Sequence, residues 1–544
     1  MAVEPRPTIQ LEVDGRQVEI ADRGATLLEV LREDLGLRSA KDGCSPQGQC
    51  GCCTVLVDGQ PRVACVTPVR RVAGRTITTV DGLPADVRGG WADAFCATGA
   101  SQCGFCTPGI VCRLEGLRAK GAPAGADGHP AVEQALLAHL CRCTGWRTLL
   151  DAWDHATQPT PTPAADPDRR ELVGERVQER RTSPTGSRSG ASARAALEGG
   201  TAQAVSPEVA LGQGGFADDT APADALVAVP DGDGGWAVGA TLTEARAAAG
   251  KVQGRRTTVD PHPPLDLPPG DWAATLRTAW VEPAYLEPDA SWCEPGGEPT
   301  SPLANGGAFG GKLATPVTAA ARALADQHGR AVRVLLGRED VVRLGPKRPP
   351  IAGGARADGS GVVRVVRTPG IAQAIASVAP GFTVEEVDVP GPPTSAEVRA
   401  AGWAEATVLL AGARGTTAPV VDPHTGATAT ASIGDDGVVR VEVDAGDPLD
   451  EVVLRSYATG AAHMALSWVS SEGIAVDDDG VVHDLTIRSF GVLRAVDTPP
   501  IEITVIPSDD TPKRAADAVF TAVAAAAWLH AGAPTDWPTG TRWR

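Results

Sequence analysis

Residues 42–55 read DGCSPQGQCGCCTV and place four cysteines among three glycines within fourteen residues. A loop that wraps tightly round an iron–sulfur core must turn backbone amides inward, which needs conformations that glycine adopts cheaply. Cys65 follows, with eleven residues between it and Cys53. The stretch therefore predicts an iron–sulfur site. A zinc or free-thiol cluster is the alternative, but zinc sites favour paired short spacings without such a glycine wrap.

Two further motifs carry paired cysteines: QCGFCTPG at 102–109 and LCRCTGW at 140–146. Eleven of the twelve cysteines lie between Cys44 and Cys143. In a long chain without a leader-like start, clustered thiolates hold metal more often than they form disulfides. We therefore expect a second metal site, built where the ends of antiparallel helices converge. Cys96 and Cys112 lie outside the motifs and are interpreted as small buried side chains.

The elements around the first motif are predicted by periodicity and turn residues. Residues 8–21 alternate around Asp14-Gly15, and residues 54–65 around Asp58-Gly59, so each stretch predicts a β-hairpin. Between them, Thr26 begins an amphipathic helix that ends at Gly36. From about residue 90 to 156 the spacing of apolar residues becomes helical and predicts four short helices.

The chain divides into four segments by composition. Residues 7–82 are expected to form a β-rich domain and residues 83–156 a helical one. Residues 157–205 are rich in Pro, Ser, Gly and charge, and are predicted to be a disordered linker. Residues 206–544 mix short strand-like and helical runs, which indicates an α+β region.

The first motif together with Cys65 resembles the plant-type ferredoxin domain of the xanthine dehydrogenase and aldehyde oxidase family, a family of molybdenum hydroxylases. The family usually has one residue fewer between the first two cysteines and an alanine at Cys52. Aligned through Thr54-Val55, the resemblance implies a [2Fe-2S] cluster held by Cys44, Cys50, Cys53 and Cys65, with Cys52 in place of the alanine.

The second pair of motifs resembles the helical [2Fe-2S]-binding domain of the same family. It implies a second cluster held by Cys103, Cys106, Cys141 and Cys143. In the family, the residues equivalent to Gln102 and Cys143 also lie near the pterin of the molybdenum cofactor. The implied fold is multidomain α+β: a β-grasp ferredoxin-like domain, a four-helix [2Fe-2S]-binding domain and a molybdopterin-binding-like α+β region.

Residues 206–544 resemble a shortened form of the family's molybdenum-binding subunit. The matching stretches, in family order, are GGFADD at 214–219, VEPAYLEPDA at 281–290, GGAFGGK at 306–312, VRVLLGREDVVRLGPKRP at 332–349 and FGVLRAVDTPPIEITVIP at 490–507. Glycines let a backbone come close to a cofactor, and an aromatic ring can wall a substrate pocket. The implied cofactor-binding residues of the glycine-rich loop are Gly306, Gly307, Phe309, Gly310 and Gly311.

The catalytic glutamate of the family lies in a Gly-Glu-Pro context near the C-terminus. Here TPKRAADAVF (511–520) stands in that region, and Asp517 is the nearest carboxylate. Asp517 is therefore the candidate general base, and a charge at a helix N-terminus is the alternative interpretation. Leu313 follows Lys312 where purine-oxidising members usually carry an acid, so xanthine itself is not implied.

The resemblance implies an enzyme that oxidises an N-heterocycle or aldehyde with water-derived oxygen and sends the electrons through two [2Fe-2S] clusters. The expected cofactor is molybdopterin in its cytosine dinucleotide form, with no FAD in this chain and a separate flavin subunit or other electron acceptor as partner; a homo-oligomer is compatible with this scheme. The alternative is a non-catalytic electron-transfer subunit with a degenerate molybdenum region. A redox sensor is a weaker third interpretation.

The charge and hydropathy of the chain limit which kinds of partner are expected. Lys and Arg number 49 against 67 Asp and Glu, for a formal net charge of −18, and no basic stripe is present. Nucleic acid is therefore not expected as a partner. Because no stretch has the length and hydropathy of a membrane span and the start has no leader pattern, we expect a cytoplasmic protein that binds a small-molecule substrate.

Overall fold

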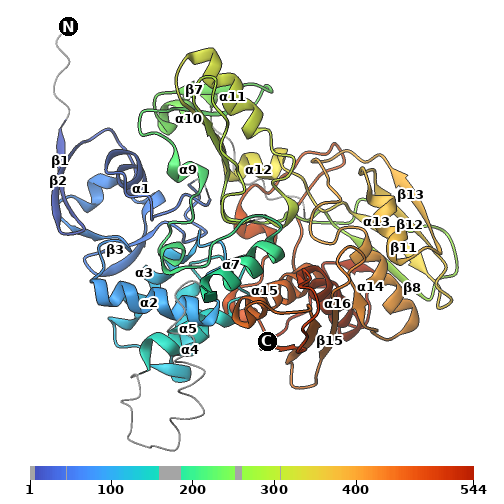
Figure 1. Ribbon diagram of the computed structural model, residues 1–544. Helices are drawn as coiled ribbons and strands as arrows, with labels where there is room; N and C mark the ends of the chain where they lie inside the picture. The colour runs from blue at the N-terminus through green and yellow to red at the C-terminus, as the bar shows by residue number, and fades with distance from the viewer. Residues whose placement is uncertain (1–6, 45, 159–185, 251–259, 307) are drawn as a thin grey trace, which may run out of the picture.

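The structure is a computed structural model that describes residues 7–44, 46–158, 186–250, 260–306 and 308–544. In Figure 1 the N-terminal residues, in blue, lie on one side of the molecule and the C-terminal residues, in orange and red, lie on the other. A green and yellow lobe at the top of the view contains α10 (Leu242–Ala249) and α11 (Val317–His328). The expected multidomain α+β class is confirmed, because the described residues form four β-sheets together with many helices.

The first sheet has five strands in the order β2-β1-β5-β3-β4. Its strands are β1 (Thr8–Val13), β2 (Arg16–Ala21), β3 (Thr54–Val57), β4 (Gln60–Val63) and β5 (Thr76–Thr78). Asp14 and Gly15 have φ angles of 49° and 76°, and Asp58 and Gly59 have 48° and 73°. Positive φ at both turn residues is what a two-residue hairpin turn requires, so both predicted hairpins are confirmed.

Thr26 begins the helical segment between these hairpins, as predicted. Its hydroxyl accepts a hydrogen bond from the Glu29 N–H at 3.2 Å, which caps α1 (Leu27–Glu29). The segment continues as a π-helical turn, η1 (Val30–Asp34), and Gly36 follows with a φ of 67°.

Four α-helices follow over the stretch where four were predicted. They are α2 (Ala85–Thr98), α3 (Thr107–Arg118), α4 (His129–Leu136) and α5 (Arg147–Thr157), with a 3-10 turn, η4 (Gly125–Gly128), before α4. Trp91 of α2 and Trp153 of α5 are buried with ring centroids 6.1 Å apart. Helix α3 packs on the first sheet so closely that a Cβ at Gly116 would lie 2.3 Å from Pro61. The helical unit is thus fixed to the β-rich unit.

Helix α7 (Gly186–Gly199) corrects the prediction of a disordered linker over residues 157–205. Residues 159–185 of that segment lie outside the described residues. The Arg194 side chain is fully buried and donates hydrogen bonds to the carbonyl oxygens of Pro448 and Lys513, each at 2.8 Å. Glu198 accepts from the Ala516 N–H at 3.0 Å. Composition could not predict this helix because the groups that bury it lie more than 250 residues later in the chain.

The described part of residues 206–544 contains three sheets. Their orders are β7-β6-β10-β9, β13-β12-β11-β8-β18 and β14-β15-β16-β17. The strands are β6 (Leu226–Pro230), β7 (Trp236–Gly239), β8 (Ala274–Thr278), β9 (Asp289–Cys293), β10 (Val332–Leu336), β11 (Ile351–Ala355), β12 (Gly361–Val366), β13 (Phe382–Val387), β14 (Val420–Val421), β15 (Thr428–Ile433), β16 (Val439–Asp444), β17 (Ile501–Val505) and β18 (Asp536–Trp537).

The described residues of this region form nine α-helices. They are α8 (Pro207–Ala210), α9 (Ala217–Thr220), α10, α11, α12 (Arg338–Leu344), α13 (Ile371–Val378), α14 (Trp403–Arg414), α15 (Glu451–Ser470) and α16 (Ala516–His530). Helices α15 and α16 lie against each other, with Trp468 and Phe520 stacked at 5.2 Å between ring centroids. The Arg348 guanidinium lies 3.9 Å from the Trp468 ring centroid, a cation–π contact inside this core.

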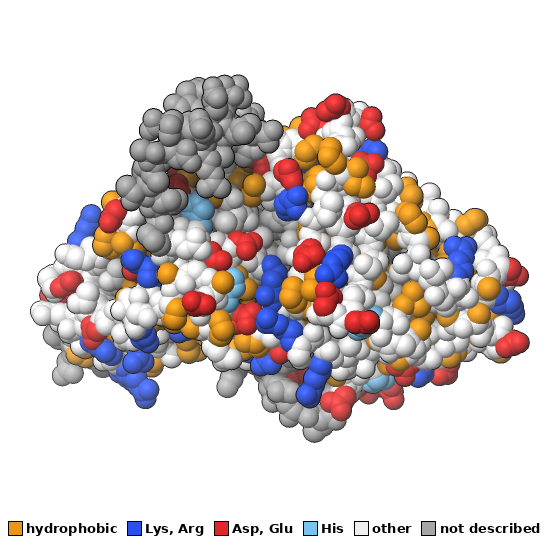
Figure 2. All heavy atoms as spheres, turned by 90° about the horizontal axis from the view of Figure 1, so that it is seen from below, with side chains coloured by type: hydrophobic (Ala, Val, Ile, Leu, Met, Phe, Trp, Pro, Cys, Tyr) orange, Lys and Arg blue, Asp and Glu red, His pale blue; other side chains and the backbone are white. Residues whose placement is uncertain are grey.

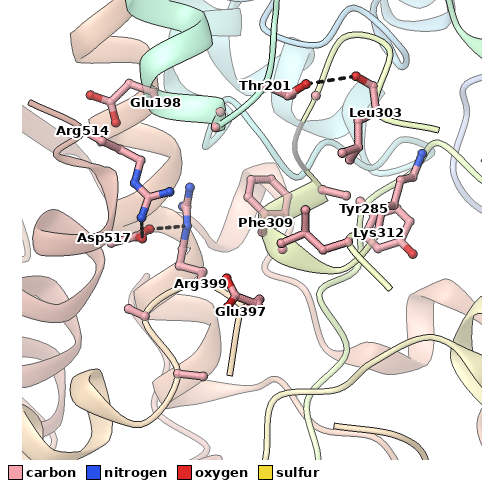
Figure 3. A pocket seen from close by; sticks show the side chains of 18 of the residues that line it. Glu198, Thr201, Tyr285, Leu303, Phe309, Lys312, Glu397, Arg399, Arg514 and Asp517 are labelled. Carbon is pink, nitrogen blue, oxygen red and sulfur yellow. Dashed lines mark hydrogen bonds and ion pairs between the residues drawn. The ribbon is translucent and has the colours of Figure 1, made fainter. Parts of the chain in front are cut away.

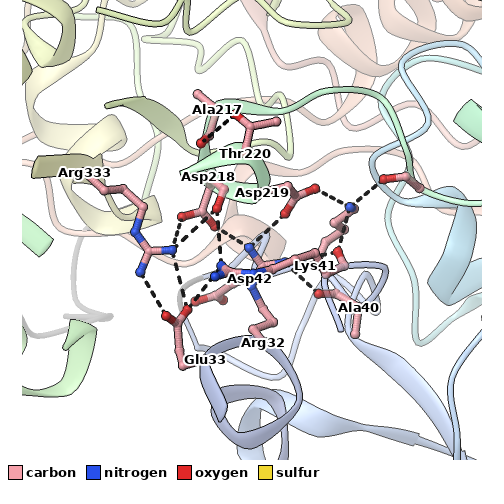
Figure 4. Close-up of polar contacts among 12 residues, drawn as sticks. Arg32, Glu33, Ala40, Lys41, Asp42, Ala217, Asp218, Asp219, Thr220 and Arg333 are labelled. Atoms are coloured by element: carbon pink, nitrogen blue, oxygen red, sulfur yellow. Dashed lines mark hydrogen bonds and ion pairs between the residues drawn. The ribbon is translucent and has the colours of Figure 1, made fainter. Parts of the chain in front are cut away.

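A buried ionic network joins the first domain to the sheet of β6 and β10 (Figure 4). Arg32 contacts Asp218 at 2.7 Å and Asp219 at 2.9 Å, and Arg333 of β10 contacts Asp218 at 3.0 Å and Glu33 at 3.2 Å. Burial alone would raise the pKa of Asp218, but the charges of Arg333 and Arg32 outweigh it and lower that pKa to about 2. The carboxylate is therefore ionised and fixed between two guanidinium groups.

The outer surface has mixed charge on the face that Figure 2 shows, where Lys and Arg side chains are interspersed with Asp and Glu. Within the described ranges, no helix combines the length and the hydropathy that crossing a bilayer demands.

Candidate metal and cofactor site

The first cysteine set is brought together by the loop before β3 and by the end of β4. Cys50 and Cys65 lie close enough to Cys44 to lower its pKa, and Cys53 lies close enough to Cys65 to raise the pKa of Cys65. The Cys65 N–H donates to Cys53 Sγ at 3.5 Å. All four side chains are at most 2% exposed. Four thiols that gather in a buried loop with backbone N–H groups directed at sulfur have the donor chemistry of a [2Fe-2S] site.

The alternative of a zinc site gains no support from the geometry. Gly48 and Gly51 in the loop have φ angles of 70° and 73°. These left-handed conformations fit the predicted wrapping of the loop round a larger inorganic core.

The second cysteine set lies where α3 begins and between α4 and α5. Cys103 Sγ and Cys143 Sγ are 3.7 Å apart, and Cys106 and Cys141 lie close enough for each to shift the pKa of the other. The neighbouring Cys106 and the Thr144 hydroxyl, which lies 3.1 Å from Cys141 Sγ, lower the pKa of Cys141 in spite of its burial. The structure thus brings together the four predicted ligands of a second cluster.

The two cysteine sets touch each other through the backbone. The Leu140 N–H donates to the carbonyl oxygen of Cys50 at 2.9 Å, directly before Cys141 in the chain. On the far side of the second set, the Gln102 amide donates to the Cys143 carbonyl oxygen and to Ser456 of α15, each at 2.9 Å. The second set therefore stands between the first set and the C-terminal region.

A cavity of about 700 Å³ lies against the second set. It is large enough for a sizeable organic cofactor. Its walls combine the cysteine side, the glycine-rich loop and the N-terminal end of α16, as Figure 3 shows in part. Of the predicted cofactor-binding and catalytic residues, the ones that line it are Gln102, Cys143, Gly306, Phe309, Gly310 and Asp517. Gly311 instead backs the loop, where an added Cβ would lie 2.6 Å from Tyr285, and Gly307 lies outside the described residues.

The glycine-rich loop is held in its shape by a second backbone segment. Ala308, Phe309 and Gly310 all have positive φ, at 47°, 54° and 86°. The Arg399 N–H donates to the Phe309 carbonyl oxygen at 3.0 Å, and a Cβ at Gly310 would lie 1.9 Å from the Glu397 carbonyl oxygen. Gly310 is thus required by close approach as well as by conformation. The loop turns the Phe309 ring toward the cavity (Figure 3).

Lys312, at the end of this loop, is fully buried beside Glu287. The two side chains form an ion pair at 2.8 Å, and Lys312 also donates to the Pro288 and Pro302 carbonyl oxygens. Burial raises the pKa of Glu287 to about 7, against the opposing effect of Lys312. The pair anchors the loop next to the cavity.

Asp517 lies in the first turn of α16 and faces two arginines (Figure 3). Its Oδ1 is 3.3 Å from Arg399 and its Oδ2 is 3.2 Å from Arg514. Each carboxylate oxygen therefore faces one guanidinium group. The sequence did not predict that Arg399 and Arg514 line the cavity. The only nearby signal of a cationic partner for Asp517 was the basic pair Lys513-Arg514.

Comparisons with known proteins agree with these domains. Residues 11–70 match the 2Fe-2S iron-sulfur cluster binding domain, and residues 79–154 match the [2Fe-2S] binding domain. Two such domains joined to a cavity-bearing α+β region define an iron–sulfur protein of the oxidoreductase class.

Relatives and a solved structure extend this classification. The chain is 36% identical over 149 residues to the xanthine dehydrogenase iron-sulfur-binding subunit of Escherichia coli, a match that covers 26% of this chain and 90% of that protein. It is 42% identical over 135 residues to the aldehyde oxidoreductase of Megalodesulfovibrio gigas, a match that covers 24% of this chain but only 14% of that protein. The chain belongs to the xanthine dehydrogenase and aldehyde oxidase family.

The fold of the whole chain also has a counterpart. The crystal structure of the aldehyde oxidoreductase from Desulfovibrio desulfuricans matches 98% of this chain and 99% of that chain with a TM-score of 0.65 at 15% identity. The family resemblance predicted from the cysteine motifs is therefore confirmed, and the fold similarity reaches into the C-terminal region.

Proposed function

We propose that this chain is a molybdenum-dependent hydroxylase that oxidises an N-heterocycle of purine-like class, or an aldehyde, and passes the electrons through two [2Fe-2S] clusters. The observation that carries the proposal is the 700 Å³ cavity, because Cys103 and Cys143 of the second set form one of its walls. A redox cofactor in that cavity would lie against a cluster, and electrons would need no further carrier between them.

The residues of the cavity fit the molybdenum cofactor. When bound, this cofactor supplies a two-electron redox centre that inserts water-derived oxygen. Gln102 and Cys143 would hold the pterin on one wall, and the backbone of residues 306–311 would approach it on the other, where Gly310 leaves room for no side chain. Phe309 would pack against the substrate, and Asp517 would take the proton from the attacking water.

The proposal extends to the form of the cofactor and to the acceptor. We infer a molybdopterin cytosine dinucleotide and an electron acceptor on another polypeptide, such as a flavin subunit, with no FAD in this chain. The electrons would leave through the first cysteine set, which lies on the side of the second set away from the cavity.

A second candidate function is an electron-transfer subunit whose C-terminal region acts as a scaffold. The ion pairs of Asp517 with Arg399 and Arg514 favour it, because they give this carboxylate a structural role in the cavity wall. In that case the catalytic subunit would be a separate chain.

Metal analysis of anaerobically purified protein distinguishes the hydroxylase from the electron-transfer subunit. The hydroxylase is expected to contain four irons and about one molybdenum per chain and to release a pterin nucleotide on denaturation. A screen of aldehydes and azaheterocycles with a dye acceptor should then show activity. Four irons without molybdenum, from a host that makes the cofactor, would refute the hydroxylase and support the electron-transfer subunit.

A further inference from the structure

A short segment of the C-terminal region, residues 485–488, contacts the loop of the first cysteine set from outside. The Gln47 side-chain amide donates a hydrogen bond to the Leu485 carbonyl oxygen at 3.0 Å and accepts one from the Ile487 N–H at 3.1 Å. The Leu485 and Ile487 side chains are buried, so the core holds the segment in place. The cysteine loop is thus fixed by residues that come 438 and 440 positions after Gln47.

Arg488 extends from this segment to the residue that directly precedes Cys50. Its Nε donates to the Gln49 carbonyl oxygen at 3.0 Å, and its backbone N–H donates to the Gln49 side-chain oxygen at 3.2 Å. Its Nη2 donates to the Leu137 carbonyl oxygen at 2.6 Å. One guanidinium group therefore joins the loop of the first cysteine set to the chain that leads to Cys141 in the second.

The positive charge of Arg488 has no carboxylate partner in the described part of the chain. The two acceptors of its guanidinium group are backbone carbonyl oxygens, and none of the charges that act on it belongs to a carboxylate. Arg494, further along the same stretch, instead pairs with Asp497 at 2.5 Å. A guanidinium group stays protonated in proteins. The loop of the first cysteine set therefore has an uncompensated cation fixed beside it.

We propose that Arg488 is a positioning residue that raises the reduction potential of the first cluster. Reduction adds an electron and makes the cluster more negative. A positive charge held beside the loop stabilises the reduced state more than the oxidised state. A higher potential in the first cluster favours electron transfer from the second cluster to the first, which is the direction of the exit in the proposed function. The shift itself depends on the first cluster and not on molybdenum.

The test uses the full chain, purified anaerobically, with two readouts: iron per chain and a dithionite titration followed by electron paramagnetic resonance. Arg488→Gln is expected to keep four irons and to shift the potential of the first cluster to more negative values, with the second cluster unchanged. Arg488→Glu should shift it further, and Arg488→Lys, which keeps the charge, should lie between wild type and Arg488→Gln. Cys53→Ala should lose the first cluster and so identify its signal.

The dependence on salt separates an effect of charge from one of structure. Arg488 is exposed, so dissolved ions screen its charge. The difference in potential between wild type and Arg488→Gln should therefore become smaller as the ionic strength rises. A difference that salt does not change would assign the effect to the lost hydrogen bonds and overturn the proposal.

Arg494→Gln is the matched control, because Asp497 already compensates the charge of Arg494. This variant should leave both potentials where they are. Loss of two irons in Arg488→Gln would give Arg488 a structural role and overturn the proposal. An order of first-cluster potentials other than Arg above Lys above Gln above Glu would overturn it as well. If the glutamine variant does not fold, the order of Arg, Lys and Glu decides.

Discussion

Gly51 and Gly59 share one backbone conformation, with a φ of 73° at each, but their surroundings differ. A Cβ at Gly51 would lie 2.5 Å from His139 Cδ2 and 2.7 Å from the Ala138 carbonyl oxygen. A Cβ at Gly59 would have nothing within 4 Å. Alanine variants of these two glycines therefore separate two costs in the free energy of unfolding. One is the cost of the left-handed conformation, and the other is the cost of a clash between the two cysteine-bearing units.

Gly59→Ala should reduce the free energy of unfolding by about 1–2 kcal/mol, the strain of a left-handed residue. Gly51→Ala carries the same strain and must also displace His139, which adds about 1–3 kcal/mol. We expect only the Gly51 variant to lose iron from the first set. Urea midpoints and iron content measure both effects, and an equal loss in the two variants would show that the contact with His139 is unimportant.

Asp517 offers a second test at this scale, which depends on the proposed hydroxylase. Asp517→Asn should lower the turnover number by about 10²–10⁴-fold if the carboxylate is the general base. Iron and molybdenum content should stay unchanged. Asp536→Asn, which alters an exposed carboxylate paired with Arg277, is the control. Full activity of the Asp517 variant would assign it to a purely structural role beside Arg399 and Arg514.

At the scale of elements, the network of Arg32, Asp218 and Arg333 attaches η1 and the following loop to the sheet of β6 and β10 (Figure 4). The side chains of Arg32 and Arg333 are each 4% exposed. Removing the shared carboxylate would leave two buried guanidinium groups with fewer partners, whereas an exposed ion pair is screened by water.

Asp218→Ala should therefore lower the free energy of unfolding by about 3–5 kcal/mol. Glu298→Ala, which removes the exposed partner of Arg322, should change it little. Urea titrations of the two variants provide the comparison. If Asp218→Ala unfolds at the wild-type urea concentration, the network does not hold the domains together.

Local sequence signals predicted the elements whose partners lie nearby. The turns at Asp14-Gly15 and Asp58-Gly59 predict their hairpins, because the pairing strands flank them directly. Helix α7 could not be predicted, since Arg194 and Glu198 are buried by groups near residues 447 and 515. The cysteine spacings likewise predict both thiol sets, whereas Arg399 reaches Asp517 only through the tertiary fold.

At the scale of the whole molecule, two buried histidines make stability depend on pH. Burial lowers the pKa of His139 and of His463 to about 3, from an ordinary value of 6.5. Below about pH 6.5 the unfolded chain takes up protons that the folded chain cannot accept. Stability is therefore lost as the pH falls from about 6.5 toward 3, by about 1.4 kcal/mol per pH unit for each histidine.

The free energy of unfolding should thus fall steadily between about pH 6 and pH 5. His463→Gln should make this decline shallower, while His262→Gln, at an exposed position, should leave it unchanged. Urea unfolding at several pH values measures the slope. A slope that is the same in the His463 variant and in the wild type would contradict the assignment.

Buried ion pairs join the part of the chain before residue 158 to the part after residue 186. Arg142 and Glu472 are both buried and form an ion pair, in which Arg142 Nη2 lies 2.7 Å from Glu472 Oε2. Arg32 and Asp218 form another buried ion pair, also at 2.7 Å. Cutting the chain between residues 158 and 186 would therefore yield a heterodimer and not two free fragments. The peptide link adds a fixed one-to-one stoichiometry, which two separately translated polypeptides would have to reach by diffusion and mass action.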